Sequence, residues 1–365
     1  MLGFPTAAAI TAIASTMSFA DYREVLTCKP HAQKGAHTWL SMKYFIVIVL
    51  SLLTPKLLLA EPIVLATKSG ALHGTLEIPQ TASSLPCPIA LIIAGSGPTN
   101  RDGNTTGLSG ANHSLKLLAQ GLVATGIASV RYDKRGVGES AKAAVKESDL
   151  RFDTLIDDAV LWGRRLRQDK RFSSLIIIGH SEGSLIGIVA ARKLEADALV
   201  SIAGAGRPIA QIILEQVRPQ LSPALMKQTE EIVRTLTKGK TAPISPELNA
   251  LFRPSVQPYL ISWFRYDPAQ ELRRLSVPVL IVQGTTDIQL SVREAELLAK
   301  AKPSARLLII EGMNHVLKAV SNDRDKQLSS YVDPTLPIVP ALVRDICFFI
   351  AGLKPTNALA CGPAA

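Results

Sequence analysis

Residues 175–190 read LIIIGHSEGSLIGIVA, in which an apolar run leads into Gly179-His180-Ser181-Glu182-Gly183 and then into a second apolar stretch. The first run is short and rich in isoleucine, as in a buried strand, and the second has the length and composition of a helix. Glycines on both sides of Ser181 permit a tight, strained turn that presents a serine hydroxyl above a sheet. An ordinary glycine turn capped by Ser181 is the structural alternative. The stretch favours an α/β fold with a reactive serine.

Strands and helices alternate on both sides of this turn. A predicted hairpin covers residues 63–78. Further strands are predicted at 88–93, 127–132, 198–203, 277–282 and 305–311, with helical stretches between most of them. Short apolar strands joined by helices indicate a mostly parallel sheet with helices on both faces.

Residues 207–268 interrupt this alternation. They contain helical stretches at 208–217 and 224–237, followed by a proline-rich and aromatic segment. We expect them to form a small helical lid above Ser181, with Trp263 and Phe264 as candidates for binding the substrate. The alternative is that these two aromatic side chains only pack the lid against the core.

A serine hydroxyl needs a base to become a nucleophile, and the base needs an orienting carboxylate. In folds of this kind the three residues follow in the order Ser, Asp, His, after successive strands. Of the histidines beyond residue 60, only His315 comes late enough, directly after a predicted strand. His180 adjoins the serine, and we expect its side chain to point elsewhere.

Three aspartates are candidates for the carboxylate. Asp287 follows the predicted strand 277–282 through a short loop, which is the expected position. Asp197 precedes a strand and so belongs to the wrong edge of the sheet, and Asp267 is a reserve candidate at the end of the lid. The predicted triad is therefore Ser181, Asp287 and His315.

The tetrahedral intermediate of acyl transfer needs backbone N–H donors. One is expected from the residue after the nucleophile and one from the loop after the third strand. These residues are Glu182 and Ser96, and Gly95 and Gly97 allow the loop to approach the substrate.

Together these residues resemble the α/β-hydrolase superfamily, in its branch of bacterial esterases, serine aminopeptidase-like enzymes and dienelactone hydrolases. The resemblance covers about residues 63–354 and is carried by segments 95–103, 131–140, 179–183, 284–287 and 313–315. It implies an α/β-hydrolase fold but does not name a substrate. One departure is Ala94, where many relatives carry histidine; it leaves the backbone donor of Ser96 intact and puts the side-chain hydrogen bonds of that loop in doubt.

Composition excludes several classes of function. The formal net charge is +10 over 365 residues, and basic residues are spread rather than gathered on a run, so no nucleic-acid partner is expected. No cysteine or histidine spacing suggests a zinc site, and no metal or cofactor is expected. After residue 60, Cys87, Cys347 and Cys361 allow at most one disulfide within the chain, and Cys347 is interpreted as a small buried apolar residue.

The N-terminal region resembles an export signal. Met42-Lys43 is followed by an apolar run at 44–53 and by a small residue before Glu61, which is the order of a secretory signal peptide. A membrane anchor is the alternative, but Pro55 and Lys56 interrupt the run. We expect residues 1–41 to be a mis-annotated extension, 42–60 a signal peptide, 61–354 the catalytic domain and 355–365 a tail. No stable membrane span is expected after cleavage, and the mature protein is expected to be periplasmic or secreted.

The sequence predicts a serine hydrolase that cleaves carboxylic esters of small or medium acyl groups through an acyl-enzyme on Ser181. A serine peptidase acting on short peptides is an alternative with the same triad. A non-catalytic binding protein on this scaffold is a third possibility, although no member of the triad is missing. Acyl and alcohol specificity and the oligomeric state are left open.

Overall fold

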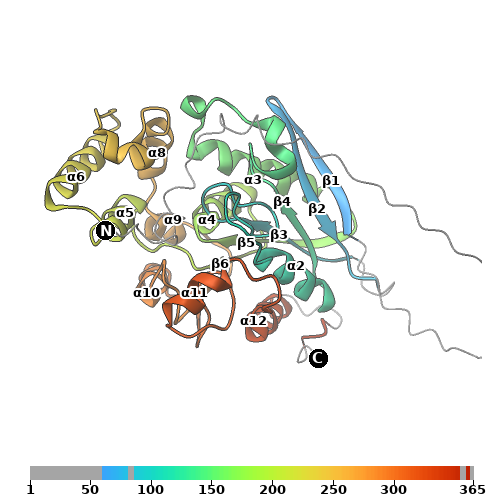
Figure 1. Ribbon diagram of the computed structural model, residues 1–365. Helices are drawn as coiled ribbons and strands as arrows, with labels where there is room; N and C mark the ends of the chain where they lie inside the picture. The colour runs from blue at the N-terminus through green and yellow to red at the C-terminus, as the bar shows by residue number, and fades with distance from the viewer. Residues whose placement is uncertain (1–59, 81–85, 354–358, 362–365) are drawn as a thin grey trace, which may run out of the picture.

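The computed structural model describes residues 60–80, 86–353 and 359–361. The predicted extension at 1–41, and the predicted signal peptide up to residue 59, lie outside these residues. Figure 1 shows a central sheet with helices on both sides, as the sequence predicts.

The described residues form an eight-stranded sheet in the order β1-β2-β4-β3-β5-β6-β7-β8. Strands β1 and β2 pair antiparallel with each other, β2 pairs antiparallel with β4, and all other neighbours are parallel. Strands β3, β6 and β7 are buried along their whole length, which explains their continuous apolar sequences. The strands are β1 (Ala60–Thr67), β2 (Gly70–Glu77), β3 (Cys87–Ile93), β4 (Ala128–Tyr132), β5 (Phe172–His180), β6 (Ala198–Ile202), β7 (Val279–Gly284) and β8 (Arg306–Ile310).

Helices cover the two faces of the sheet and form two apolar cores. One core joins the sheet to α3 (Phe152–Arg167), α4 (Glu182–Leu194) and α10 (Val292–Ala301). The other joins the opposite face to α2 (Ser114–Ala124) and α12 (Pro340–Ala351). Two shorter helices precede β7 and α12, respectively: α9 (Pro268–Arg273) and α11 (Arg324–Ser330).

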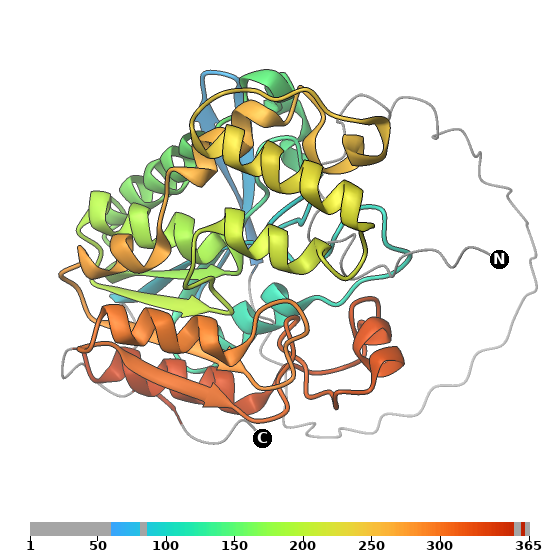
Figure 2. The same ribbon diagram turned by 90° about the vertical axis from the view of Figure 1, so that its left-hand side faces the viewer.

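Between β6 and β7 the chain forms α5 (Ile209–Val217), α6 (Pro223–Thr237), α7 (Asn249–Phe252) and α8 (Gln257–Phe264). Figures 1 and 2 show the helices of this insertion gathered on one side of the molecule, away from β1 and β2. The insertion packs against α3, where the ring of Phe152 stacks on that of Trp263 with centroids 5.3 Å apart. The expected helical segment at 207–268 is therefore present as a separate group of helices.

Within residues 60–80, 86–353 and 359–361, no helix is long and apolar enough to cross a membrane.

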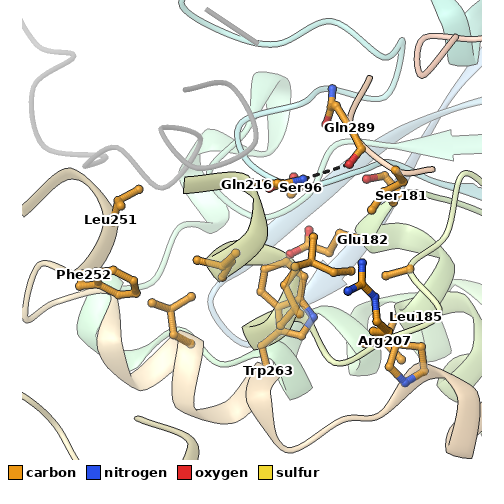
Figure 3. Close-up of a pocket in the computed structure, with 17 residues that line it drawn as sticks. Ser96, Ser181, Glu182, Leu185, Arg207, Gln216, Leu251, Phe252, Trp263 and Gln289 are labelled. Atoms are coloured by element: carbon orange, nitrogen blue, oxygen red, sulfur yellow. Dashed lines mark hydrogen bonds between the residues drawn. The ribbon is translucent and has the colours of Figure 1, made fainter. Parts of the chain in front are cut away.

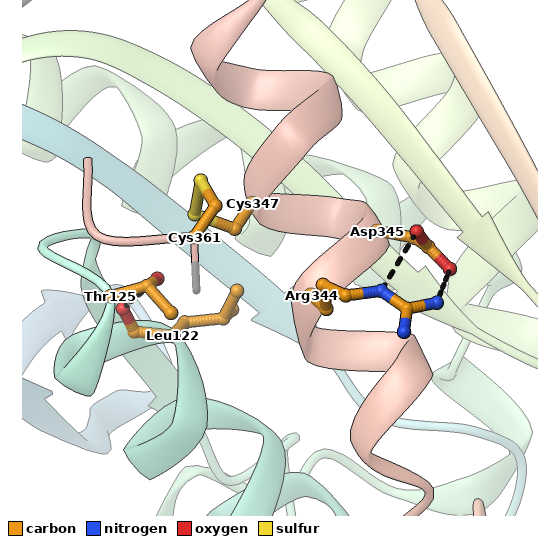
Figure 4. Close-up of a disulfide and its surroundings, with 6 residues drawn as sticks. All are labelled: Leu122, Thr125, Arg344, Asp345, Cys347 and Cys361. Atoms are coloured by element: carbon orange, nitrogen blue, oxygen red, sulfur yellow. Dashed lines mark hydrogen bonds and ion pairs between the residues drawn. A yellow bond between two sulfur atoms is a disulfide. The ribbon is translucent and has the colours of Figure 1, made fainter. Parts of the chain in front are cut away.

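Cys347 is fully buried, as expected, but the interpretation of it as a simple apolar residue is wrong. Its sulfur is bonded to that of Cys361, fourteen residues further along the chain. Figure 4 shows this disulfide beside the end of α2, and the N–H of Ala360 donates to the carbonyl of Thr125 at 3.2 Å. The disulfide therefore fixes residues 359–361 to the core, while Cys87 remains a free, buried thiol.

Candidate active site

Ser181 lies in the turn between β5 and α4 with φ of 55°. This is the left-handed region that residues other than glycine rarely adopt, and here it raises the side chain above the end of the strand. The neighbouring glycines are required by close packing. A Cβ at Gly179 would lie 2.1 Å from the carbonyl oxygen of Gly183, and one at Gly183 would lie 2.3 Å from that of Ile93. The sequence G-H-S-E-G therefore forms the strained turn that it predicts.

His315 and Asp287 come together from the loops after β8 and β7. His315 Nδ1 lies 2.8 Å from Asp287 Oδ2, and both side chains are buried. Asp287 Oδ1 also accepts the N–H groups of Gln289 and Leu290, at 2.8 and 3.0 Å. A third donor is the Gln283 side chain, 3.0 Å from Oδ2. These bonds fix the carboxylate and, through it, the orientation of the imidazole.

Two opposing effects act on the pKa of Asp287. Burial acts to raise this pKa, but the charge and hydrogen bond of His315 and the two backbone N–H groups hold it below its ordinary value. Asp287 is therefore ionised at neutral pH, as a residue that orients a histidine base must be.

Ser181 and His315 line one cavity, together with Gly95 and Ser96 of the loop after β3. Glu182 is the first residue of α4, so its N–H belongs to the first turn, where backbone N–H groups have no partner within the helix. The structure thus brings the predicted backbone donors, Ser96 and Glu182, to the same place as Ser181.

The expectation that the side chain of His180 points away from the site is wrong. Its ring lies against that of His315, with centroids 4.8 Å apart. Its Nε2 lies 2.8 Å from the carbonyl oxygen of His315, so this nitrogen must be the donor. Burial, followed by the charge of His315, lowers the pKa of His180 to about 3. His180 is therefore a neutral donor that holds the backbone of the proposed base.

The other candidate acids have structural partners. Asp267 caps the N-terminus of α9 by accepting the N–H of Gln270 at 3.1 Å, so it is not needed as a reserve. Asp197 accepts the N–H of Leu175 at 2.9 Å, near the start of β6, as its place in the sequence predicts.

A second, mainly apolar cavity lies between Ser181 and the insertion (Figure 3). Trp263 lines it, as expected, and also stacks on Phe152, so this residue combines the two roles that the sequence left open. Phe264 is buried but is not among the described residues that line the cavity. Neighbouring residues of a helix point about 100° apart, so α8 directs only one of the pair to the cavity. The other apolar residues that line the cavity include Leu185, Ile209, Ile212, Ile213, Leu251, Phe252, Leu260 and Leu290.

Sequence reasoning missed a buried polar bridge behind the proposed oxyanion hole. Lys134 Nζ donates to Glu182 Oε2 at 3.1 Å and to the carbonyl of Gly95. The hydroxyl of Tyr259, from α8, donates to Glu182 Oε1. The bridge therefore joins the insertion to both loops that supply the expected backbone donors. Its only sequence signal was the segment 131–140, which the resemblance included without assigning a role to Lys134.

Comparisons with known proteins show the family and the fold of the chain. A family model described as serine aminopeptidase, S33, matches residues 107–319, which is more than half of the chain and includes Ser181, Asp287 and His315. The chain belongs to the serine aminopeptidase (S33) family. This S33 chain is also 28% identical to esterase EstD of Thermotoga maritima over 251 residues, covering 68% of the chain. It spans 58% of the length of that curated relative.

Solved structures show the same fold for this S33 chain. Est1E from Butyrivibrio proteoclasticus, in the structure with bound ferulic acid, is 18% identical with a TM-score of 0.53, covering 79% of this chain and 99% of that one. The esterase Pf2001 of Pyrococcus furiosus is 13% identical with a TM-score of 0.51, covering 81% and 94%. At these identities the likeness establishes the α/β-hydrolase fold.

Proposed function

We propose that the protein is a serine hydrolase that cleaves carboxylic esters of small or medium acyl groups. In this mechanism Ser181 attacks the acyl carbonyl, His315 takes its proton and Asp287 orients the imidazole. The N–H groups of Ser96 and Glu182 stabilise the oxyanion. An acyl-enzyme forms on Ser181, and water then releases the acid.

One observation carries this proposal. A histidine held at 2.8 Å by a buried carboxylate lines the same cavity as a serine that occupies a strained turn. Each part has a structural explanation alone, but their convergence from three separate loops matches the requirements of nucleophilic catalysis. Among named relatives, EstD supports an ester substrate.

A peptidase with the same triad is the second candidate, favoured by the name of the family. Binding of a free amino terminus calls for an available carboxylate. Among the described residues that line either cavity, Glu182 has the only acidic side chain, and Lys134 and Tyr259 already occupy it. We therefore favour esters, and expect aminoacyl p-nitroanilides to be poor substrates.

The triad is tested with p-nitrophenyl butyrate. Ser181→Ala and His315→Ala should each lower kcat by about 10⁴-fold or more, and Asp287→Asn by about 10⁴-fold. Ser184→Ala is a matched control, because this buried hydroxyl on α4 bonds only to Ser201 among the described residues. Turnover by folded Ser181→Ala within tenfold of the wild type would refute the assignment.

The insertion is proposed to act as a lid whose Trp263 limits the length of the acyl chain. Trp263→Ala should raise the ratio of kcat/KM for p-nitrophenyl hexanoate to that for the butyrate. Phe264→Ala removes a neighbouring buried aromatic ring that does not line the cavity, so it should lower stability and leave the ratio unchanged. An unchanged ratio in Trp263→Ala, or long-chain triglycerides as best substrates, would contradict this role.

Export from a signal peptide at 42–60 is also proposed. Support comes from the order of charged, apolar and small residues there, and from the disulfide between Cys347 and Cys361, since disulfides persist mainly in oxidising compartments. N-terminal sequencing of the protein from its native cell should give a start at or near Glu61. A cytosolic chain that retains residues 1–60 would overturn the proposal.

A further inference from the structure

Two cavities meet at Ser181. Ser181, Ser96 and Gln289 line both of them. The first is the apolar cavity between Ser181 and the insertion (Figure 3). The second is lined by polar side chains, including Thr99, Thr105, Asn112, Ser114 and Tyr331. An ester whose carbonyl carbon lies at Ser181 therefore has one cavity for each of its two arms.

The position of His315 decides which arm enters which cavity, given the function proposed above. His315 lines the polar cavity and is not among the described residues that line the apolar one. When the acyl-enzyme forms, the C–O bond to the alcohol breaks, and the imidazolium gives its proton to the departing oxygen. That oxygen must lie beside His315, so the alcohol belongs in the polar cavity and the acyl chain in the apolar one.

Hydroxyl groups with free hydrogen-bonding capacity line the polar cavity. Ser114 is 2% exposed, and no described residue hydrogen-bonds to its hydroxyl. Thr99 donates its proton to the carbonyl of Ser96 at 2.9 Å. The hydroxyls of Thr99 and Thr105 lie 3.2 Å apart. Because the proton of Thr99 is already used, Thr105 must donate across this contact. Oxygen lone pairs of Thr105 therefore stay free to accept a hydrogen bond.

Tyr331 supplies a donor to the same cavity. Its hydroxyl oxygen accepts the side-chain N–H of Gln289 at 2.9 Å, so its own proton remains free. Burial, followed by the charge of Asp287, raises the pKa of Tyr331 above its ordinary value. The hydroxyl therefore stays protonated and can donate to a bound oxygen.

Apart from two histidines, the described residues that line the polar cavity carry no acidic or basic side chain. Of these two, His180 is neutral because its pKa is about 3. A phosphate or a quaternary ammonium group on the alcohol would find no side chain of fixed opposite charge there.

We propose that the substrate is an ester of an apolar acyl group with a neutral alcohol that carries further hydroxyl groups, held by Ser114, Thr105 and Tyr331.

Two esters with the same acyl group test this directly. Glyceryl monobutyrate and propyl butyrate differ only in the two additional hydroxyls of the alcohol. We expect the wild-type protein to have a kcat/KM about tenfold or more higher for the glyceryl ester. Tyr331→Phe and Ser114→Ala should each lower this preference about three- to tenfold, the value of one lost hydrogen bond.

The preference is a ratio measured in one preparation, so a reduced fraction of folded protein does not change it. Tyr266→Phe is the matched control, because the Tyr266 hydroxyl bonds to Asp153 and this residue lines neither cavity. It should keep the wild-type preference. An equal fall in Tyr266→Phe would overturn the assignment of Tyr331.

The outcomes separate this inference from the proposed function. Equal turnover of both esters, or faster turnover of butyrylcholine, would overturn the alcohol assignment and leave an esterase. Failure to cleave these esters and p-nitrophenyl butyrate would refute the proposed function itself. Butyrylated glucose tests the source of the hydroxyls: its turnover above that of the glyceryl ester identifies a sugar, and the reverse order identifies a glycerol-sized alcohol.

Discussion

His180 should make the folded protein sensitive to mild acid, and replacing it should remove that sensitivity. The ring is buried, donates to the carbonyl of His315 and lies against the imidazole of His315. Burial and the charge of His315 lower its pKa from 6.5 to about 3, while the hydrogen bond to the carbonyl of His315 and the charge of Asp287 oppose this shift only in part. A neutral His180 is thus part of the folded state.

The size of the effect follows from proton linkage. Below pH 6.5 the unfolded chain binds a proton at His180 that the folded chain does not bind until about pH 3. The stabilisation from this neutral histidine is therefore complete above pH 6.5 and is lost as the pH falls towards 3. Between pH 8 and pH 5 the loss amounts to about 2 kcal/mol. Asp287, with its lowered pKa, begins to contribute only at lower pH.

The variant His180→Gln keeps a side-chain N–H for the carbonyl of His315 but cannot titrate. Urea unfolding at pH 8 and pH 5 should show that it loses about 2 kcal/mol less than the wild type between these values. His180→Phe separates the proton from the hydrogen bond. It should be about 1–3 kcal/mol less stable at pH 8, because the carbonyl is left without its donor. Between pH 8 and pH 5 it should lose as little stability as His180→Gln does. If His180→Gln loses as much stability as the wild type, the reasoning is refuted.

Two further predictions concern stability. Cys361→Ala should lower the free energy of unfolding by up to about 3 kcal/mol, because its disulfide closes a segment with a sequence separation of 14. Dithiothreitol should lower the urea midpoint of the wild type but not that of the variant. Equal urea midpoints in the oxidised wild type and the variant would contradict this prediction. Glu182→Gln should cost about 3–5 kcal/mol, since the buried ammonium of Lys134 loses its partner charge. The double variant with Lys134→Met should regain part of that loss, and a wild-type midpoint in Glu182→Gln alone would show that the buried pair is dispensable.

The sequence determined the features that depend on local chemistry and on order along the chain. The run at 175–190 specified strand, turn and helix because its residues are apolar at the right lengths and because glycines flank Ser181. His315 and Asp287 were predictable since each lies within a short loop after an apolar strand, and parallel strands end at the same edge of a sheet. The structure brings the two side chains to 2.8 Å.

Only the tertiary structure decided which side chains from distant segments meet. The partners of Glu182 come from positions 134 and 259, and that of Cys347 from position 361; no local pattern encodes such pairings. Trp263 and Phe264 are adjacent and similarly apolar, so the rotation of α8 against α3 decides which of them faces the cavity. The side chain of His180 hydrogen-bonds to the carbonyl of His315, which lies in the loop after β8. The two meet only because β8 packs beside β7. These choices depend on long-range packing, which fixes orientation where composition and periodicity leave it free.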